Sequence, residues 1–215
     1  MSSPTTPASI GPGEFFPVVG VGPHEKPWPA GDQYDPELLL NGDRRNVLDH
    51  YRYWTVEAIV ADLNTKRHKL QIAIENWQHD LNIGSIVRTA NAFNVSGVHI
   101  VGKRDWNKRG AMVTDRYLTV MHHPTIEEFA KYCKEQDLPI IGIDNVPGSK
   151  QLESATLPES CVLLFGQEGA GMSDEGIAVC EVLYEINQYG STRSMNASAA
   201  GAIAMYHWAL QHLPR

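Results

Sequence analysis

Short apolar runs alternate with segments of helical periodicity from about residue 70 to the C-terminus. The runs are five or six residues long and rich in β-branched residues, which is typical of buried strands. They predict strands at residues 70–75, 97–101, 138–143, 161–165 and 182–186. Apolar positions at helical spacing predict helices at about residues 81–94, 125–137, 173–180 and 195–212. This alternation predicts an α/β fold with a mostly parallel sheet flanked by helices.

The N-terminal part of the chain has a different composition. Residues 1–40 hold eight of the 13 prolines, with Gly, Ser and Thr among them. Such a segment buries too little apolar surface to offset chain entropy, so it is predicted to be a flexible tail. Over residues 44–63 apolar positions recur at roughly helical spacing and predict one amphipathic helix. The chain is therefore expected to comprise a tail (1–40), a helical extension (41–68) and a main domain (69–215).

Composition and cysteine usage limit the class of protein. The chain is 42% hydrophobic and 20% charged, and it has no apolar run near the roughly 20 residues that span a bilayer. No secretory signal is visible, so we expect a cytoplasmic protein without a membrane partner. Cys133, Cys161 and Cys180 are odd in number and lack metal-ligand spacing, which favours reduced thiols. His122 and His123 are adjacent and point apart in a regular element, so no metal site is expected.

The charge distribution bears on a nucleic-acid partner. The formal net charge is -7, but residues 44–116 hold 12 basic and 7 acidic residues and carry a net charge of +5. Residues 102–124, which overlap the end of this range, form a long polar connection with five basic residues, and long loops in compact domains are often functional. The charges can equally be those of solvated helices and loops. The pattern leaves both interpretations open.

The segment LLFGQEGAGMS, residues 163–173, resembles a phosphate-binding loop without its lysine. Gly166 to Ser173 matches that loop except that Met172 replaces the lysine, and Glu168 would repel a phosphate. A dinucleotide fingerprint also fails, because Asp174 stands at the position of its third glycine. A neutral or cationic ligand suits this loop better than a nucleoside triphosphate. The alternative is a glycine-rich turn with Ser173 as a helix N-cap.

Two more polar clusters follow predicted strands, where ligands of open α/β sheets bind. After residues 70–75, Gly84 and Arg88 lie on a different helix face from the apolar stripe, and Gly84 is expected to leave open space one turn before Arg88. A lone arginine on a helix is more often a solvated charge. After residues 182–186, a strip of small residues allows close packing: Ser194, Ala197, Ser198 and Gly201. The alternative is tight helix packing, with Asn196 as a cap.

The three clusters together resemble a known family. In order, they read N-x-G-x-x-x-R-T-A, L-F-G-Q-E-G-x-G-M-S and I-x-x-x-G-x-x-x-S-M-N-x-S-x-A-A-G. These closely resemble the three motifs of the SpoU/TrmH-type RNA 2'-O-ribose methyltransferases of the SPOUT superfamily, over about residues 69–213. The resemblance implies an S-adenosylmethionine-dependent enzyme with a C-terminal deep trefoil knot. It also implies a homodimer and a tRNA or rRNA substrate.

The resemblance also assigns residues to roles. The implied catalytic residues are Arg88, Asn82 and Asn196. The implied cofactor-binding residues are Gly166, Glu168, Ile186, Ser194 and Met195. RNA binding is expected from the long basic loop, where Trp106 could stack on a base: Lys103, Arg104, Lys108 and Arg109. Asn187, Gln188 and Arg193 depart from the commoner third motif, which leaves the RNA unidentified.

The implied reaction moves a methyl group from a sulfonium to a ribose 2'-oxygen. Arginine stays protonated at nearly any pH, so we expect Arg88 to hold a phosphate and the developing alkoxide while a phosphate or water takes the proton. One alternative is a non-catalytic RNA-binding protein that retains the fold. Another is an unrelated nucleotide-binding α/β protein. A compact chain without a separate RNA-binding domain favours tRNA as the substrate.

Overall fold

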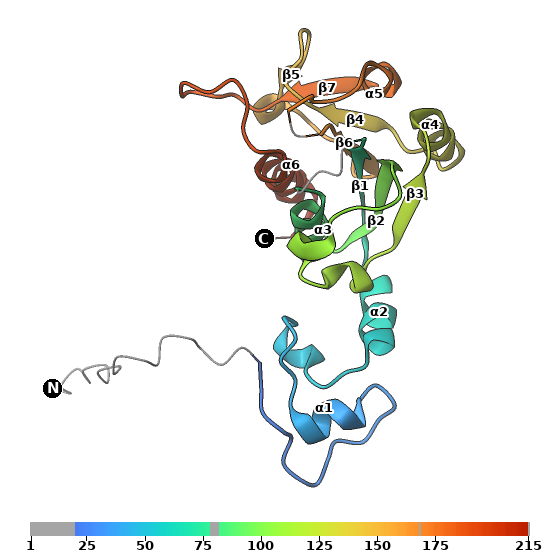
Figure 1. The fold of residues 1–215 in the computed structure, drawn as a ribbon, viewed down its shortest axis with the longest axis vertical. Coiled ribbons are helices and arrows are strands. Elements are labelled where there is room, and N and C mark those ends of the chain that lie inside the picture. The colour runs from blue at the N-terminus through green and yellow to red at the C-terminus, as the bar shows by residue number, and fades with distance from the viewer. Residues whose placement is uncertain (1–19, 78–81, 168, 215) are drawn as a thin grey trace, which may run out of the picture. The chain divides into compact units, whose positions relative to one another are not determined.

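The computed structural model describes residues 20–77, 82–167 and 169–214. The chain divides into two compact units, residues 1–59 and 60–215, which are described separately. The second unit contains a seven-stranded sheet of order β3-β2-β1-β6-β4-β7-β5 in which every neighbouring pair is parallel (Figure 1). The strands are β1 (His68–Asn76), β2 (Val95–Gly102), β3 (Val120–His123), β4 (Ile140–Ile143), β5 (Lys150–Gln151), β6 (Cys161–Phe165) and β7 (Val182–Glu185).

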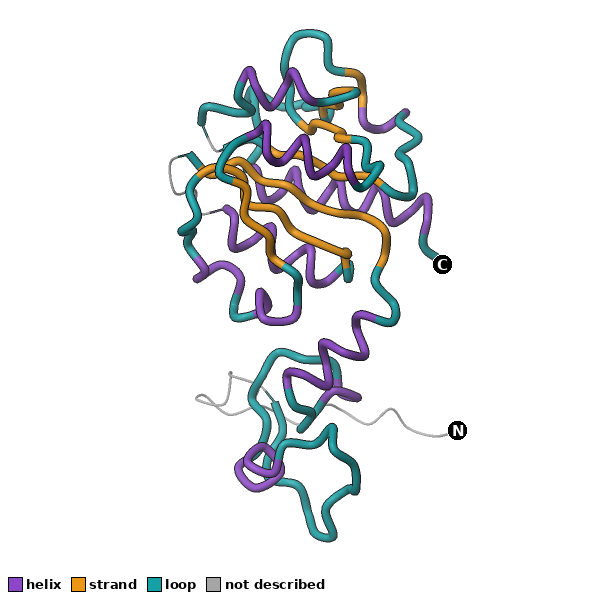
Figure 2. Tube along the Cα trace, turned by 90° about the vertical axis from the view of Figure 1, so that its right-hand side faces the viewer, coloured by secondary structure: helices purple, strands orange, loops and turns teal. Residues whose placement is uncertain are grey.

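Helices cover both faces of this sheet (Figures 1 and 2). They are α3 (Asn82–Ala92), α4 (Ile126–Glu135), α5 (Asp174–Val179) and α6 (Ala197–His212). One apolar cluster joins the sheet to α3 and α6 through residues such as Ile86 and Trp208, and a second joins the other face to α4 through Phe129. The central strands are therefore buried on both sides, which explains why their sequences read as continuous apolar runs.

The predicted α/β fold with a parallel sheet is confirmed. All five predicted strands and all four predicted helices of this unit form, each within two residues of the expected ends. Two strands were not predicted: β5 is two residues long, and β3 is an edge strand inside the expected long connection 102–124. The same connection contains two short 3-10 helices, η2 (Lys108–Ala111) and η3 (Thr114–Tyr117). The C-terminal knot stays a prediction.

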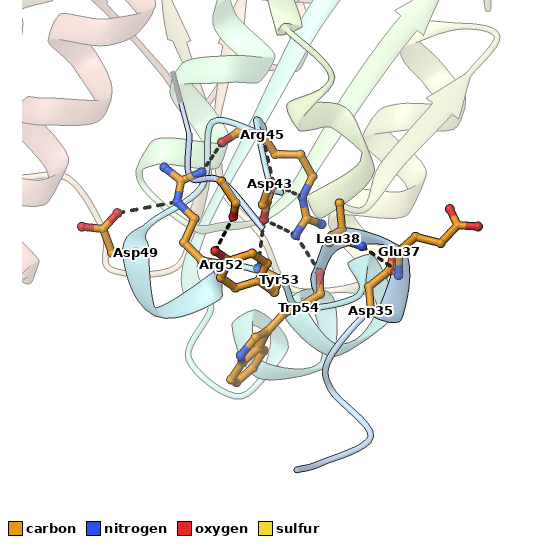
Figure 3. A network of polar contacts seen from close by, with 10 residues as sticks. Asp35, Glu37, Leu38, Asp43, Arg45, Asp49, Arg52, Tyr53 and Trp54 are labelled. Carbon is orange, nitrogen blue, oxygen red and sulfur yellow. Dashed lines mark hydrogen bonds and ion pairs between the residues drawn. The ribbon is translucent and has the colours of Figure 1, made fainter. Parts of the chain in front are cut away.

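The single helix predicted over residues 44–63 is wrong. The chain instead forms η1 (Asp49–Tyr51), passes through Tyr53 in the left-handed region (φ 64°) and begins α2 (Val56–Asn64). Figure 3 shows a polar network centred on the fully buried Asp43, and we attribute the break to this network. Side chains that bind backbone groups locally compete with helix formation, and periodicity alone does not reveal this.

The carboxylate of Asp43 organises the first unit by accepting four hydrogen bonds. Arg45 donates from Nε (2.9 Å), Nη2 (2.7 Å) and its backbone N–H (3.0 Å), and Tyr53 donates its backbone N–H (3.0 Å) (Figure 3). Burial opposes ionisation of Asp43, but the hydrogen bonds from Arg45 and Tyr53 outweigh it and lower the pKa of Asp43. Arg45 also donates to the Trp54 carbonyl (2.7 Å). This guanidinium therefore serves the internal network, although it contributed to the basic count of residues 44–116.

Residues 20–40 contain ordered structure although they lie in the predicted flexible tail. They include most of α1 (Pro36–Asn41), which Asp35 caps by accepting the Glu37 N–H at 2.9 Å. The His24 N–H donates to the Leu39 carbonyl at 2.8 Å. An Asp-Pro start is a local helix signal that the overall proline content concealed. Residues 1–19, the rest of the predicted tail, lie outside the described residues.

Within the described ranges, no helix is both long enough and apolar enough to cross a bilayer.

A buried histidine pair, His99 and His123, is expected to make stability depend on pH. The His99 Nε2–H donates to Gln71 Oε1 (2.7 Å), so His99 Nδ1 accepts from His123 Nε2–H (2.9 Å). Burial, with a smaller contribution from His123, lowers the pKa of His99 to about 3. Below pH ~6.5 His99 binds a proton in the unfolded chain but stays neutral in the folded protein. Protonation therefore favours the unfolded state, and stability is lost as the pH falls toward the folded-state pKa.

We therefore expect the free energy of unfolding to fall between pH 7 and pH 5. The slope approaches about 1.4 kcal/mol per pH unit for this one proton. Urea unfolding measured at half-unit intervals gives the slope. His99→Gln removes the titrating ring but keeps hydrogen-bonding capacity, and its slope should be smaller. Equal slopes for wild type and variant would show that His99 does not cause the dependence.

Candidate cofactor and RNA site

A cavity of about 510 Å³ lies at the carboxyl ends of β4, β6 and β7, the edge where ligands of parallel sheets bind. Its walls come from the turn after β4, the loop after β6 and the segment between β7 and α6. The cofactor-binding residues predicted from the sequence that line it are Gly166, Ile186, Ser194 and Met195. Glu168, the fifth of that set, lies outside the described residues. The structure thus brings four of the five into one cavity.

The glycines of the second motif fold the loop back on itself. Gln167 and Gly171 exchange two backbone hydrogen bonds of 3.0 Å, which closes the loop. A Cβ on Gly166 would lie 2.2 Å from the carbonyl carbon of Gly171 and the nitrogen of Met172, so this position accepts only glycine. At Gly166 the backbone of the loop therefore packs directly against itself.

Met172 occupies the position of the missing lysine and serves the core. Its side chain is only 6% exposed, belongs to the apolar cluster on the α4 face and lies with Sδ 3.9 Å from Cys180 Sγ. Ser173 Oγ accepts the Gly176 N–H at 3.0 Å and caps α5, as one of the two sequence interpretations expected. The cap and the cavity wall coexist in one loop.

A buried carboxylate, which the sequence analysis did not identify, holds the second-motif loop through hydrogen bonds. Glu75, at the end of β1, is fully buried and accepts hydrogen bonds from the Ser173 N–H (3.0 Å), Ser173 Oγ (2.8 Å) and Trp77 Nε1 (3.0 Å). Burial raises the pKa of Glu75, and the hydrogen bonds from Ser173 and Trp77 oppose that rise. The available signal was an acidic residue in an otherwise apolar strand.

The first and third motifs meet through two asparagines. Asn196 caps α6, its Oδ1 accepting the Ser198 N–H at 3.0 Å, and its Nδ2 donates to Asn82 Oδ1 at 2.8 Å. Asn82 begins α3 and is 8% exposed. Asn196 is thus the helix cap that the alternative interpretation expected, and it also contacts the predicted catalytic motif through Asn82.

The small-residue strip of the third motif is split by the start of α6. The helix begins at Ala197, so Ser194 precedes it and lines the cavity. Farther along, the buried Gly201 packs against α3, where an added Cβ would lie at an ordinary contact distance of 3.4 Å from Ile86 Cγ1. Close helix packing is therefore correct for Gly201 but not for Ser194.

Arg88 lies on α3, six residues after Asn82, and its side chain is exposed. It is not among the described residues that line the cavity. The open space predicted beside Gly84 does not exist, because backbone of the basic loop fills it. A Cβ on Gly84 would lie 2.8 Å from the Asn107 oxygen and from the Ala111 nitrogen. Gly84 therefore holds the basic loop against the helix that carries Arg88.

The basic loop after β2 is anchored at its beginning as well. Asn76 Nδ2 donates to the carbonyls of Lys103 (2.8 Å) and Asp105 (3.0 Å). Lys108 pairs with Asp115 at 3.0 Å, and its Nζ lies 5.5 Å from the ring centroid of the half-buried Trp106. The predicted RNA-binding side chains are all exposed: Lys103, Arg104, Lys108 and Arg109. Their role stays a prediction.

Over the described part of the chain, no group of three His, Cys, Asp or Glu side chains could hold a metal ion.

The parallel sheet, with a cavity at its carboxyl edge, has the architecture of α/β proteins whose ligands bind at that edge. The model of the SpoU rRNA Methylase family matches residues 69–206, and the chain belongs to this family. This confirms the family resemblance recognised in the three motifs.

Curated relatives include two tRNA (guanosine(18)-2'-O)-methyltransferases. The enzyme of Borreliella burgdorferi is 26% identical over 147 residues, which cover 67% of each chain. The enzyme of Thermus thermophilus is 23% identical over 159 residues, covering 70% of this chain and 79% of its own.

Solved structures show the same fold. The A. aeolicus TrmH/SpoU tRNA modifying enzyme superposes with a TM-score of 0.64 at 21% identity, over 73% of this chain and 81% of its own. The SpoU methyltransferase AviRb from Streptomyces viridochromogenes, in complex with AdoMet, gives a TM-score of 0.63 at 23% identity, over 71% and 64% of the two chains.

Proposed function

We propose that the protein is an S-adenosylmethionine-dependent RNA 2'-O-ribose methyltransferase that acts on tRNA in the cytoplasm as a homodimer. Family membership and the names of the Borreliella and Thermus enzymes support this. The observation that carries it is the Asn196–Asn82 hydrogen bond of 2.8 Å. It ties the segment lining the cavity to the helix that bears Arg88, so cofactor and nucleophile sites form one unit.

The residues of the cavity fit the proposed cofactor. Gln167 lines the cavity, and its Oε1 is buried without a hydrogen-bond partner among the described residues, so it would accept a hydrogen bond from an adenine amino group. Asp144 and Glu185 also line it, which suits a cationic ligand. S-adenosylmethionine supplies a methyl group activated on a positively charged sulfur. Gly166, Ile186 and Met195 would hold it, with Ser194 beside them.

Arg88 supplies the charge that the acceptor needs. The ribose 2'-oxygen becomes negative as it attacks, and its proton must leave. An arginine remains protonated, so Arg88 binds the adjacent phosphate and the developing negative charge, and a phosphate or water takes the proton. Asn82, held by Asn196, positions the ribose beside it.

An apolar surface on α6 supports the dimer in this proposal. Ile203, Tyr206 and Leu210 are 42%, 57% and 42% exposed and recur at helical spacing. Exposed apolar residues grouped on one helix face are typical of interaction sites. Analytical ultracentrifugation of the wild type and Tyr206→Glu measures the dimer directly.

Methyl transfer tests the function. The purified protein is incubated with labelled S-adenosylmethionine and total RNA from cells that lack it, and the RNA is digested to nucleosides. We expect label in one 2'-O-methylated nucleoside of the tRNA fraction. Cofactor binding by calorimetry without transfer to any RNA would favour the non-catalytic alternative.

The exposed basic loop should bind RNA phosphates. Arg104→Gln with Arg109→Gln is expected to weaken RNA binding and to reduce the slope of log K against log salt by about 0.7–0.9 for each phosphate that the variant no longer binds. Filter binding across a range of KCl concentrations measures both effects. Lys131→Gln, on α4 on the other face of the sheet, serves as the matched control. An unchanged slope in the double variant would assign RNA binding to another surface.

A further inference from the structure

The turn after β4 lies outside all three sequence motifs, yet its side chains contact the loops of two of them. Asp144 Oδ2 accepts the Met172 N–H of the second-motif loop at 2.7 Å. Asn145 Nδ2 donates to the Arg193 carbonyl of the third-motif segment. Both turn residues line the cavity, as do Met172 and Arg193. Two adjacent side chains thus connect opposite walls of the proposed cofactor site.

The main chain of this turn is itself fixed. The Asp144 N–H donates to the Tyr184 carbonyl of β7 at 3.0 Å, and the Asp144 carbonyl accepts from Ser149 Oγ at 2.8 Å. Asp144 Oδ1 accepts the Asn145 N–H at 2.8 Å, which orients the carboxylate. The turn is a rigid part of the sheet edge, so it can set the separation of two loops that have little regular structure of their own.

The carboxylate is placed close to the second-motif loop by a glycine. A Cβ on Gly171 would lie 2.8 Å from Asp144 Oδ2, and Gly171 adopts a positive φ of 73°. Arg193 and Glu185 also line the cavity, so its charged groups include one guanidinium and two carboxylates among the described residues. A net negative lining favours a cationic ligand over a neutral one of the same shape.

We infer that Asp144 and Asn145 are positioning residues for the cofactor, and that the Asp144 charge discriminates S-adenosylmethionine from its product. This rests on the proposed function. In the reaction the methyl group passes from sulfur to the ribose oxygen, the hydroxyl proton leaves, and the sulfur becomes a neutral thioether. Holding both loops in place reduces the ordering cost of binding for either ligand. The carboxylate favours only the sulfonium form, so it promotes exchange of product for fresh cofactor.

Calorimetry with S-adenosylmethionine and with S-adenosylhomocysteine separates the two contributions. Asp144→Asn keeps the shape of the side chain and one hydrogen-bond acceptor but removes the charge. It should lower the affinity for S-adenosylmethionine relative to that for S-adenosylhomocysteine by about tenfold. Asn145→Ala removes the link to Arg193 without changing charge, so it should weaken both ligands by a similar factor. Glu181→Gln removes an exposed carboxylate outside the cavity lining and should leave both affinities as in the wild type.

Thermal unfolding of each variant shows whether a lower affinity reflects loss of the fold. An unchanged affinity ratio in Asp144→Asn overturns the charge discrimination, and unchanged affinities in Asn145→Ala overturn the positioning role. Failure of the wild type to bind either ligand rejects the proposed function, and this inference with it. Normal wild-type binding with unaffected variants rejects this inference alone.

Discussion

Arg88→Lys is expected to lower kcat by about 100- to 1,000-fold, the usual cost of losing one oriented stabiliser of transition-state charge. Lysine keeps the positive charge but lacks the planar fork that binds a phosphate and a second oxygen together. Arg88 is exposed on α3 and is not among the described residues lining the cofactor cavity. The Kd for S-adenosylmethionine should therefore stay close to that of the wild type. Single-turnover methyl transfer together with calorimetry measures the two quantities separately.

Two further variants define what the arginine does. Arg88→Met removes the charge, so it should be slower than Arg88→Lys if electrostatic stabilisation contributes beyond geometry. Lys131→Met removes an exposed cation from α4, on the opposite face of the sheet, and should leave kcat unchanged. Near-normal turnover of Arg88→Lys would show that the planar guanidinium is not needed for catalysis. Near-normal turnover of Arg88→Met would show that Arg88 has no catalytic role.

The sequence was sufficient where a signal is local or repeated. The buried strands could be predicted from their sequences, because a strand covered on both faces must be apolar throughout. The cavity residues Gly166, Ile186, Ser194 and Met195 were named from the family resemblance of the motifs, and they meet because the parallel sheet brings the ends of its strands to one edge. The edge strand β3 and the short β5 lack that signal, since each pairs with only one neighbour.

Tertiary contacts explain what the sequence did not reveal. Asp43 prevents the predicted helix 44–63 through partners up to ten residues away. Gly84 was expected beside open space, but its neighbour is backbone from a loop more than 20 residues later. Glu75 at the end of β1 and Asp144 in the turn after β4 support the second-motif loop, and neither belongs to a motif that spacing could identify. Supporting residues of this kind depend on the fold and have no pattern of their own.

Gly166→Ala is expected to lower the affinity for S-adenosylmethionine by about 100-fold, because steric overpacking costs up to about 3 kcal/mol and here it distorts the loop that lines the cofactor cavity. A Cβ would lie 2.2 Å from backbone atoms of Gly171 and Met172, and backbone cannot rotate away as a flexible side chain can. The loop must therefore open, breaking the paired hydrogen bonds between Gln167 and Gly171. Because both cofactor and product use this wall, their affinities should fall together, as calorimetry with each ligand will show.

Other glycines separate this clash from backbone strain and from a general effect of substitution. Gly169→Ala has open space around the new Cβ but a positive φ of 86°, so only strain of about 1–2 kcal/mol applies and the loss should be near tenfold. Gly22→Ala, in the first unit, has neither a neighbour within 4 Å nor a positive φ, and should bind as the wild type does. If Gly166→Ala binds S-adenosylmethionine no more weakly than Gly169→Ala does, the loop tolerates a side chain at residue 166. The close backbone contact between Gly166 and Met172 would then not shape the cofactor site.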